Sequence, residues 1–168
     1  EEACRQIVEL QALGLELPKG SVNVSALQFN PAFIGKVSEV LTKTGLRPMR
    51  LQLELTEGIM LDDTEATIRA LSHLKDLGVR LSIDDFGTGY SSLSYLSRFP
   101  LDELKIDRSF VIDFDKSEND ASLVIAIIAM AKSMRLHLVA EGVETHEQYH
   151  FLRNNGASVI QGYLFSKP

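Results

Sequence analysis

Six short apolar runs in the sequence each end at a polar residue that could bind a metal ion or a phosphate group. The residues at, or directly after, these ends are Asn23, Glu54, Asp84-Asp85, Lys105 with Asp107, Glu141 and Gln161. Carboxylate and amide oxygens favour Mg²⁺, Mn²⁺ or Ca²⁺ over zinc. The paired Asp and the two Glu carry enough negative charge for two divalent ions. Two such ions can stabilise the attacking and leaving oxygens of an in-line phosphoryl displacement.

A lysine in the same set suits the same chemistry, because the ammonium of Lys105 can hold phosphate charge or orient an attacking water. Each residue alone has an ordinary explanation. Asn, Gln, Asp and Gly favour turns, and a single Glu or Lys is usually a solvated charge. It is much less expected that such residues occur by coincidence at six successive strand ends than at any one of them. The set therefore predicts metal-assisted phosphoester hydrolysis.

Strands and helices alternate along the chain, which predicts a parallel sheet covered by helices. The strand patterns cover 21–24, 51–55, 79–83, 101–106, 136–140 and 157–160. Helical patterns cover 4–13, 31–44, 68–77, 91–97, 119–134 and 145–156. Asn30 is the expected N-cap of the second helix, and Thr145 with Gln148 forms an expected capping box in the last.

The number of strands limits the possible architectures. A closed barrel of eight strand–helix units takes about 250 residues. Six strands therefore predict either an open sheet or about two-thirds of a (β/α)8 TIM-like barrel. In such a barrel all the strands end at one face, where barrel enzymes keep their chemistry.

Composition excludes several classes of protein. The 168 residues contain 17 Lys+Arg and 23 Asp+Glu, a net charge of −6, which argues against binding a nucleic acid polymer. The single cysteine, Cys4, excludes an internal disulfide and fits a reducing compartment. No apolar stretch reaches the roughly 20 residues that span a bilayer. We expect a cytoplasmic domain without a membrane segment, although a longer parent chain could carry an anchor elsewhere.

One motif competes with this interpretation. The segment His146-Glu147-Gln148-Tyr149-His150 matches H-E-x-x-H, a zinc-protease pattern. Residues 151–168 contain no His, Glu, Asp or Cys that could be the usual third ligand. Phe151 and Leu152 mark the buried side of the predicted helix, with the two histidines roughly opposite. We therefore expect exposed histidines and no zinc centre.

The motifs and their order resemble the EAL domain, the cyclic di-GMP phosphodiesterase family. The resemblance covers about Ala3 to Pro168. It implies a (β/α)8-type barrel with one antiparallel strand, and hydrolysis of cyclic di-GMP to linear pGpG with Mg²⁺ or Mn²⁺ in a two-metal site. Such chemistry belongs to bacterial second-messenger signalling. The motifs that carry the resemblance are Asn23-Val24-Ser25, Glu54-Leu55-Thr56-Glu57, Asp84-Asp85-Phe86-Gly87-Thr88-Gly89-Tyr90-Ser91-Ser92-Leu93, Leu104-Lys105-Ile106-Asp107, Ala140-Glu141-Gly142-Val143-Glu144 and Gln161-Gly162-Tyr163.

The resemblance also implies a role for each residue of the set. Lys105 orients the nucleophilic water. Glu141 serves the catalytic water as general base or through a metal, and Gln161 belongs to the same network. The implied metal ligands are Asn23, Glu54, Asp84 and Asp85.

A loop after Asp85 has an implied role in binding. Glu57 resembles the glutamate that anchors this loop, residues 86–93. The loop shapes the substrate site and, by resemblance, the interface of a homodimer. Its substrate-facing residues are Phe86, Gly87, Thr88, Gly89 and Tyr90.

The sequence departs from the family pattern in two main places. The name-giving Glu-Ala-Leu, whose Glu is a metal ligand in the family, does not occur in the 168 residues. The family also continues into a closing helix after the segment that matches Phe165–Pro168. We therefore expect residues 1–168 to be an EAL phosphodiesterase domain truncated at both ends. With one carboxylate ligand missing, we expect little or no activity from these residues alone.

Two other functions stay open from the sequence. Many members of the family bind cyclic di-GMP, or regulate a neighbouring domain, without hydrolysis. A third interpretation treats the chain as a dimerisation element. Measuring binding and hydrolysis side by side, with and without Mg²⁺, would separate the first two.

Overall fold

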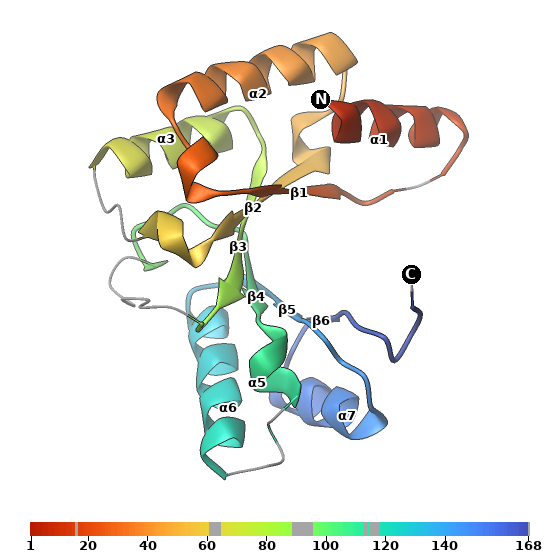
Figure 1. The fold of residues 1–168 in the computed structure, drawn as a ribbon, viewed down its shortest axis with the longest axis vertical. Helices are drawn as coiled ribbons and strands as arrows, with labels where there is room; N and C mark the ends of the chain where they lie inside the picture. The colour runs from red at the N-terminus through yellow and green to blue at the C-terminus, as the bar shows by residue number, and fades with distance from the viewer. Residues whose placement is uncertain (16, 61–64, 89–95, 113, 115–117, 168) are drawn as a thin grey trace. The chain divides into compact units, whose positions relative to one another are not determined.

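The computed structural model describes residues 1–15, 17–60, 65–88, 96–112, 114 and 118–167 (Figure 1). Most of the helix predicted at 91–97 lies outside these residues, as do Gly89 and Tyr90. The chain forms two compact units. The first is Glu1–Ser82 with Ser92–Pro100, and the second is Ile83–Ser91 with Leu101–Pro168.

The first unit contains two parallel strands and the beginning of a third. Asn23 of β1 (Gly20–Val24) lies opposite Glu54 of β2 (Leu51–Thr56), and β3 (Arg80–Phe86) begins in this unit. Helix α1 (Glu2–Ala12) packs against β1 and α2 (Pro31–Thr44), and α2 also contacts α3 (Glu65–Asp76). Three short 3₁₀ helices complete the described part, at Ala26–Gln28, Pro48–Arg50 and Glu57–Met60.

The second unit contains the end of β3 and three further strands. In β4 (Glu103–Ile106), Lys105 lies opposite Val139 of the parallel strand β5 (His137–Ala140). Ala140 in turn lies opposite Ile160 of β6 (Val159–Ile160). The helices are α5 (Arg108–Ile112), α6 (Glu118–Ser133) and α7 (His146–Asn155), and α6 packs against β4 and β5.

The observed elements confirm the predicted parallel α/β sheet. All six predicted strands are present, and the strand order β1-β2-β3-β4-β5-β6 follows the sequence. Helix α5 and the 3₁₀ helices were not predicted, because three to five residues are too few to show a helical period. The helix predicted over 4–13 ends one residue earlier than expected, because Leu13 lies just beyond α1. Leu13 caps α1 and its side chain is 76% exposed.

Each unit buries apolar side chains under its helices. Leu51 and Leu53 of β2 line an apolar cavity together with Cys4 of α1 and Val37 of α2. Because side chains alternate along a strand, the next residue, Gln52, faces the opposite side of the sheet, as does Glu54. Both are buried, and the Gln52 side chain accepts a hydrogen bond of 2.7 Å from Lys19 Nζ. In the second unit the corresponding core is Leu104, Ile106, Val124, Ile128, Leu138, Ala140 and Leu152.

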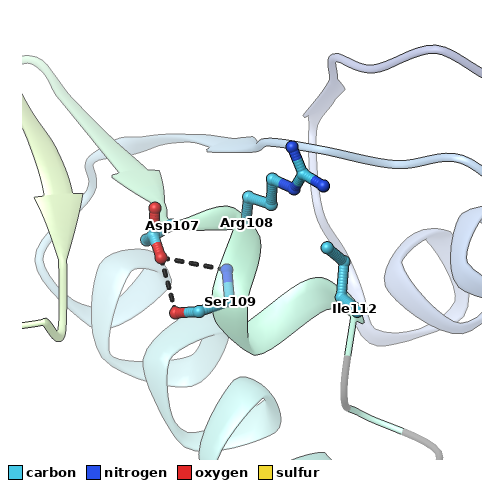
Figure 2. Close-up of a pocket in the computed structure, with 4 residues that line it drawn as sticks. All are labelled: Asp107, Arg108, Ser109 and Ile112. Carbon is cyan, nitrogen blue, oxygen red and sulfur yellow. Dashed lines mark hydrogen bonds between the residues drawn. The ribbon is translucent and has the colours of Figure 1, made fainter.

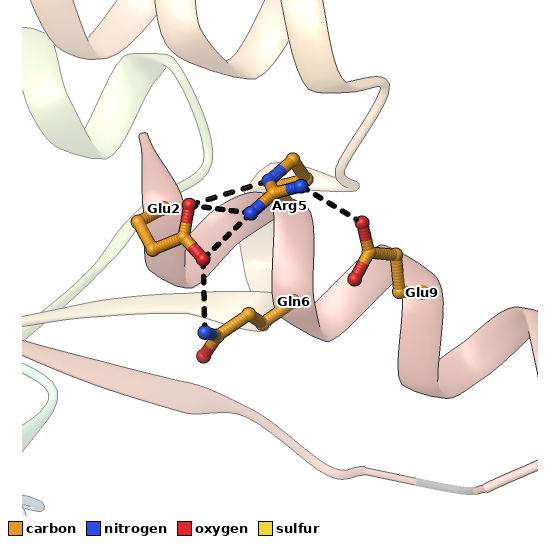
Figure 3. Close-up of polar contacts among 4 residues, drawn as sticks. All are labelled: Glu2, Arg5, Gln6 and Glu9. Atoms are coloured by element: carbon orange, nitrogen blue, oxygen red, sulfur yellow. Dashed lines mark hydrogen bonds and ion pairs between the residues drawn. The ribbon is translucent and has the colours of Figure 1, made fainter.

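The exposed face of α1 carries a small polar network (Figure 3). Arg5 pairs with Glu2 at 2.8 Å and with Glu9 at 3.4 Å, one turn away on either side. The amide of Gln6 donates a 2.9 Å hydrogen bond to Glu2. Such exposed pairs each stabilise a helix by only about 0.2–0.5 kcal/mol. The buried face of α1 therefore matters more for its place in the unit.

The predicted caps of α2 and α7 are confirmed. The Asn30 side chain accepts a 3.1 Å hydrogen bond from the Phe33 N–H, and Gly45 ends α2 with a φ of 69°. Thr145 and Gln148 form the expected capping box, in which the Gln148 N–H donates to the Thr145 hydroxyl at 3.2 Å. None of the described helices has the length and apolar character needed to cross a membrane.

The cap of α2 gives a first test. Changing Asn30→Ala removes the acceptor for the Phe33 N–H, so we expect the free energy of unfolding to fall by about 1 kcal/mol. Asn30→Asp keeps an acceptor and serves as the matched control. Urea unfolding monitored by circular dichroism measures both. Equal stability of Asn30→Ala and the unchanged protein would contradict the cap.

Candidate functional site

Lys105 lies between two carboxylates in the second unit. Its Nζ is 2.9 Å from Asp84 Oδ1 and 2.6 Å from Glu141 Oε1. The Lys105 side chain is only 8% exposed, so these ion pairs are shielded from solvent. The sheet register explains the geometry. Lys105 lies opposite Val139, and the residue two positions further, Glu141, points to the same face.

Three carboxylates gather around this lysine. Oxygens of Asp84, Asp85 and Glu141 all lie within 4.8 Å of one another. Within the described part of the chain, this is the one group of three or more acidic, His or Cys side chains with such spacing. Oxygen donors at this separation suit a hard divalent cation, so the residues present fit the predicted Mg²⁺ or Mn²⁺.

Asp85 lies near the end of β3, just before the chain enters a tight turn. Its φ of 54° lies in the left-handed region, which Asp tolerates better than most residues with a side chain. The Asp85 N–H donates to Asp84 Oδ1 at 3.1 Å, and its carbonyl accepts from the Thr88 hydroxyl at 2.9 Å. Asp85 is exposed, but partial loss of hydration, and then the charges of Asp84 and Asp107, raise its pKa. The turn therefore holds a carboxylate beside others of the same charge.

Gly87 completes this turn. Its φ is 100°, and a Cβ there would lie 2.7 Å from the Phe110 ring. Only glycine fits both the backbone conformation and the space. Of the predicted substrate loop, Phe86 is buried and Thr88 exposed, and their predicted role in substrate binding stays a prediction.

Asp107, which was in the predicted set of strand-end residues but had no predicted role, lies beside this site. Its Oδ1 accepts hydrogen bonds from the Ser109 N–H at 2.9 Å and from the Ser109 hydroxyl at 2.5 Å (Figure 2). Burial opposes its charge, but these donors lower the pKa of Asp107. The charge of Asp107 in turn raises the pKa of Asp85. The available signal was the position of Asp107 directly after β4, two residues beyond Lys105.

A surface pocket opens beside this aspartate. Asp107, Arg108, Ser109 and Ile112 line it, with a volume of about 330 Å³ (Figure 2). Gln161 and Glu141 each lie one residue beyond the paired residues Ile160 and Ala140, just past the ends of β6 and β5. The Gln161 N–H donates to the Ala140 carbonyl at 2.9 Å, and its side chain is exposed. The predicted role of that side chain in a water network stays a prediction.

The remaining predicted residues lie in the first unit. Asn23 is exposed and Glu54 is 9% exposed, and as opposite residues of parallel strands they share one face. Glu57 is buried at the start of the 3₁₀ helix that follows β2. Their roles as metal ligands and loop support stay predictions.

The histidines of the competing motif are exposed, as expected. The rings of His146 and His150 are 6.5 Å apart on α7, and Leu152 marks the buried side of that helix. Neither histidine joins a group of three candidate metal ligands in the residues that the structure covers.

The opposite pKa shifts of Asp85 and Asp107 predict opposite effects of removing their charges. In metal-free buffer at pH 7, we expect Asp85→Asn to raise the free energy of unfolding, because the fold disfavours the charged Asp85. The gain should disappear as the pH falls through the raised pKa of Asp85 towards its ordinary value of 3.8.

Asp107→Asn is the matched control and should lower the free energy of unfolding. The fold favours the charged form of Asp107, so its carboxylate contributes to the free energy of unfolding. This contribution is fully present above the ordinary Asp pKa of 3.8 and is lost as the pH falls below that value. Urea unfolding across pH 3–8 measures both variants. A loss of stability in both at neutral pH would contradict the account of Asp85.

Comparison with known proteins supports the predicted family. The EAL domain family model matches residues 1–168. The cyclic di-GMP phosphodiesterase NbdA of Pseudomonas aeruginosa is 48% identical over 167 residues, which are 99% of this chain and 21% of that protein. The chain thus spans about a fifth of the length of this relative.

Solved structures confirm the fold. The PaMucR phosphodiesterase in complex with c-di-GMP matches with a TM-score of 0.93 and 43% identity, over 99% of this chain and 68% of that one. A manganese and cyclic di-GMP complex of Klebsiella pneumoniae BlrP1 matches with a TM-score of 0.85 and 32% identity. The match covers 98% of this chain and 43% of the BlrP1 chain. The six-stranded sheet of the present chain matches that of the TIM-barrel-like EAL structures. The chain belongs to the EAL domain family.

Proposed function

We propose that the chain carries out metal-dependent hydrolysis of cyclic di-GMP to linear pGpG. The observation that carries the proposal is the buried Lys105 ammonium between Asp84 and Glu141, with Asp85 in the same carboxylate group. Membership of the EAL family, the activity named for NbdA and the ligand of the PaMucR complex support this choice of substrate.

Asp84, Asp85 and Glu141 would hold the metal, which we propose to be Mg²⁺ or Mn²⁺. The manganese in the BlrP1 complex supports this choice. Asn23 and Glu54 are further proposed ligands for a two-metal site, on the family resemblance. When bound, the ions polarise the phosphate and acidify the attacking water.

The protein's own groups would act on the water and the phosphate. The Lys105 ammonium orients the water by donating a hydrogen bond, and Glu141 accepts its proton. The water oxygen forms a bond to phosphorus while the bond from phosphorus to the 3′ oxygen of the ribose breaks, and that oxygen takes up a proton. Gln161 would hold the water from the β6 side. Glu57 and the loop beginning at Phe86 would shape the substrate site.

Two further parts of the proposal concern the setting of this reaction. We place the chain in the cytoplasm, because its only cysteine, Cys4, is a free thiol, as is usual in a reducing compartment. We also propose a homodimer through the loop after Asp85. Thr88, in the described part of this loop, is exposed.

The substrate can be tested by binding and turnover together. With Ca²⁺, we expect calorimetry to show that the purified chain binds cyclic di-GMP, and Asp84→Asn to abolish the binding. With Mn²⁺ we expect slow conversion to linear pGpG in chromatography, which EDTA stops. A folded chain that fails to bind cyclic di-GMP with either ion would contradict the proposed substrate. Binding without any turnover in the full-length parent protein would indicate a receptor instead.

Lys105 can be tested separately from the metal ligands. Lys105→Met keeps the length of the side chain but removes its charge, so we expect turnover to fall by about 10²–10³-fold. Mn²⁺ binding should persist or tighten, because a competing positive charge has left the carboxylates. Calorimetry with Mn²⁺ measures the binding. Loss of Mn²⁺ binding in a folded Lys105→Met variant would contradict this role.

A further inference from the structure

The loop after β5, Glu141–Glu144, is held tightly from two sides within the second unit. Its first residue, Glu141, carries the carboxylate that pairs with Lys105, and its N–H donates to the Ile106 carbonyl at 3.2 Å. Gly142 follows in the left-handed region with a φ of 67°. The conformation of the residues after Glu141 therefore fixes the direction in which its side chain leaves the sheet.

On one side, the segment after β6 contacts the loop backbone. The Val143 N–H donates to the Gln161 carbonyl at 3.1 Å, and the Val143 carbonyl accepts from the Leu164 N–H at 3.0 Å. Gly162 lies between these two bonds. A Cβ on Gly162 would lie 2.1 Å from the Val143 oxygen and 2.3 Å from its nitrogen, which no side chain can do. The absence of a side chain at Gly162 therefore allows the segment after β6 to lie against the backbone of Val143.

On the other side, the stem of Arg108 lies against the same loop. A Cβ on Gly142 would lie 2.6 Å from Arg108 Cγ and 2.7 Å from Arg108 Cβ. Arg108 begins α5, and its side chain extends away from the Asp107 carboxylate (Figure 2). Its guanidinium is 3.7 Å from Glu144 Oε1, in a pair whose side chains are 59% and 42% exposed. Such an exposed pair contributes little, so the packed stem is the stronger contact.

We propose that Arg108 and Gly162 are positioning residues for Glu141. Together they fix the loop Glu141–Glu144 between α5 and the segment after β6, so that the carboxylate already lies beside Lys105, Asp84 and Asp85 before a metal ion binds. The inference rests on the proposed function, because it assigns Glu141 to the metal-binding group. The stem of Arg108 acts by packing, and its charge is secondary.

Mn²⁺ affinity tests this, measured by calorimetry on the purified chain. Arg108→Ala should weaken Mn²⁺ binding by about ten-fold and lower kcat with little change in KM, while the melting temperature stays near that of the unchanged protein. Arg108→Met keeps the stem and should restore affinity to within about two-fold. Glu144→Gln, and the exposed Arg69→Ala on α3 as a matched surface control, should bind Mn²⁺ normally.

Two outcomes would overturn the proposal. One is unchanged Mn²⁺ affinity in Arg108→Ala. The other is equal weakening in Arg108→Met and Arg108→Ala, which would assign the effect to the charge. These outcomes are independent of the substrate. A chain that binds Mn²⁺ but neither binds nor cleaves cyclic di-GMP contradicts the proposed function, while the comparison of Arg108 variants still decides the positioning role.

Discussion

The candidate site depends on one buried cation. Asp84 and Glu141 both contact the Lys105 ammonium, at 2.9 and 2.6 Å, and Asp85 lies close to both. Without a positive charge among them, these carboxylates would repel one another and raise each other's pKa. A buried charge is stabilised only when its partners are close and well oriented. The ends of β3, β4 and β5 must therefore keep their register for the site to exist.

Holding these carboxylates around Lys105 lowers the stability of the surrounding backbone. Asp85 adopts a left-handed conformation, and its charge is disfavoured by partial loss of hydration and by its acidic neighbours. Asp107 is held by Ser109, so its own charge is favoured. Opposed environments for neighbouring carboxyl groups are typical of functional sites. The glycines at 87, 142 and 162 allow close contacts that a Cβ would prevent.

The sequence predicts the scaffold better than the contacts. Apolar runs that end in polar residues predict all six strands, and Asn30 and Thr145 mark helix starts correctly because capping is local. The parallel arrangement then brings Lys105 and Glu141 to one face. The electrostatic influence of Asp107 on Asp85 was missed, because it depends on how the chain turns into the five-residue helix α5. The close approach of Gly162 to Val143 is likewise a tertiary contact that no local pattern reveals. The roles of Asn23, Glu54 and Glu57 stay predictions.

The most direct test of the central claim is anomalous scattering from crystals of the chain grown with Mn²⁺ and cyclic di-GMP. The account predicts manganese peaks at coordination distance from the carboxylates of Asp84, Asp85 and Glu141, with a phosphate of the dinucleotide beside them. The account would be contradicted by manganese bound elsewhere, such as at His146 and His150, with no manganese peak at Asp84, Asp85 and Glu141.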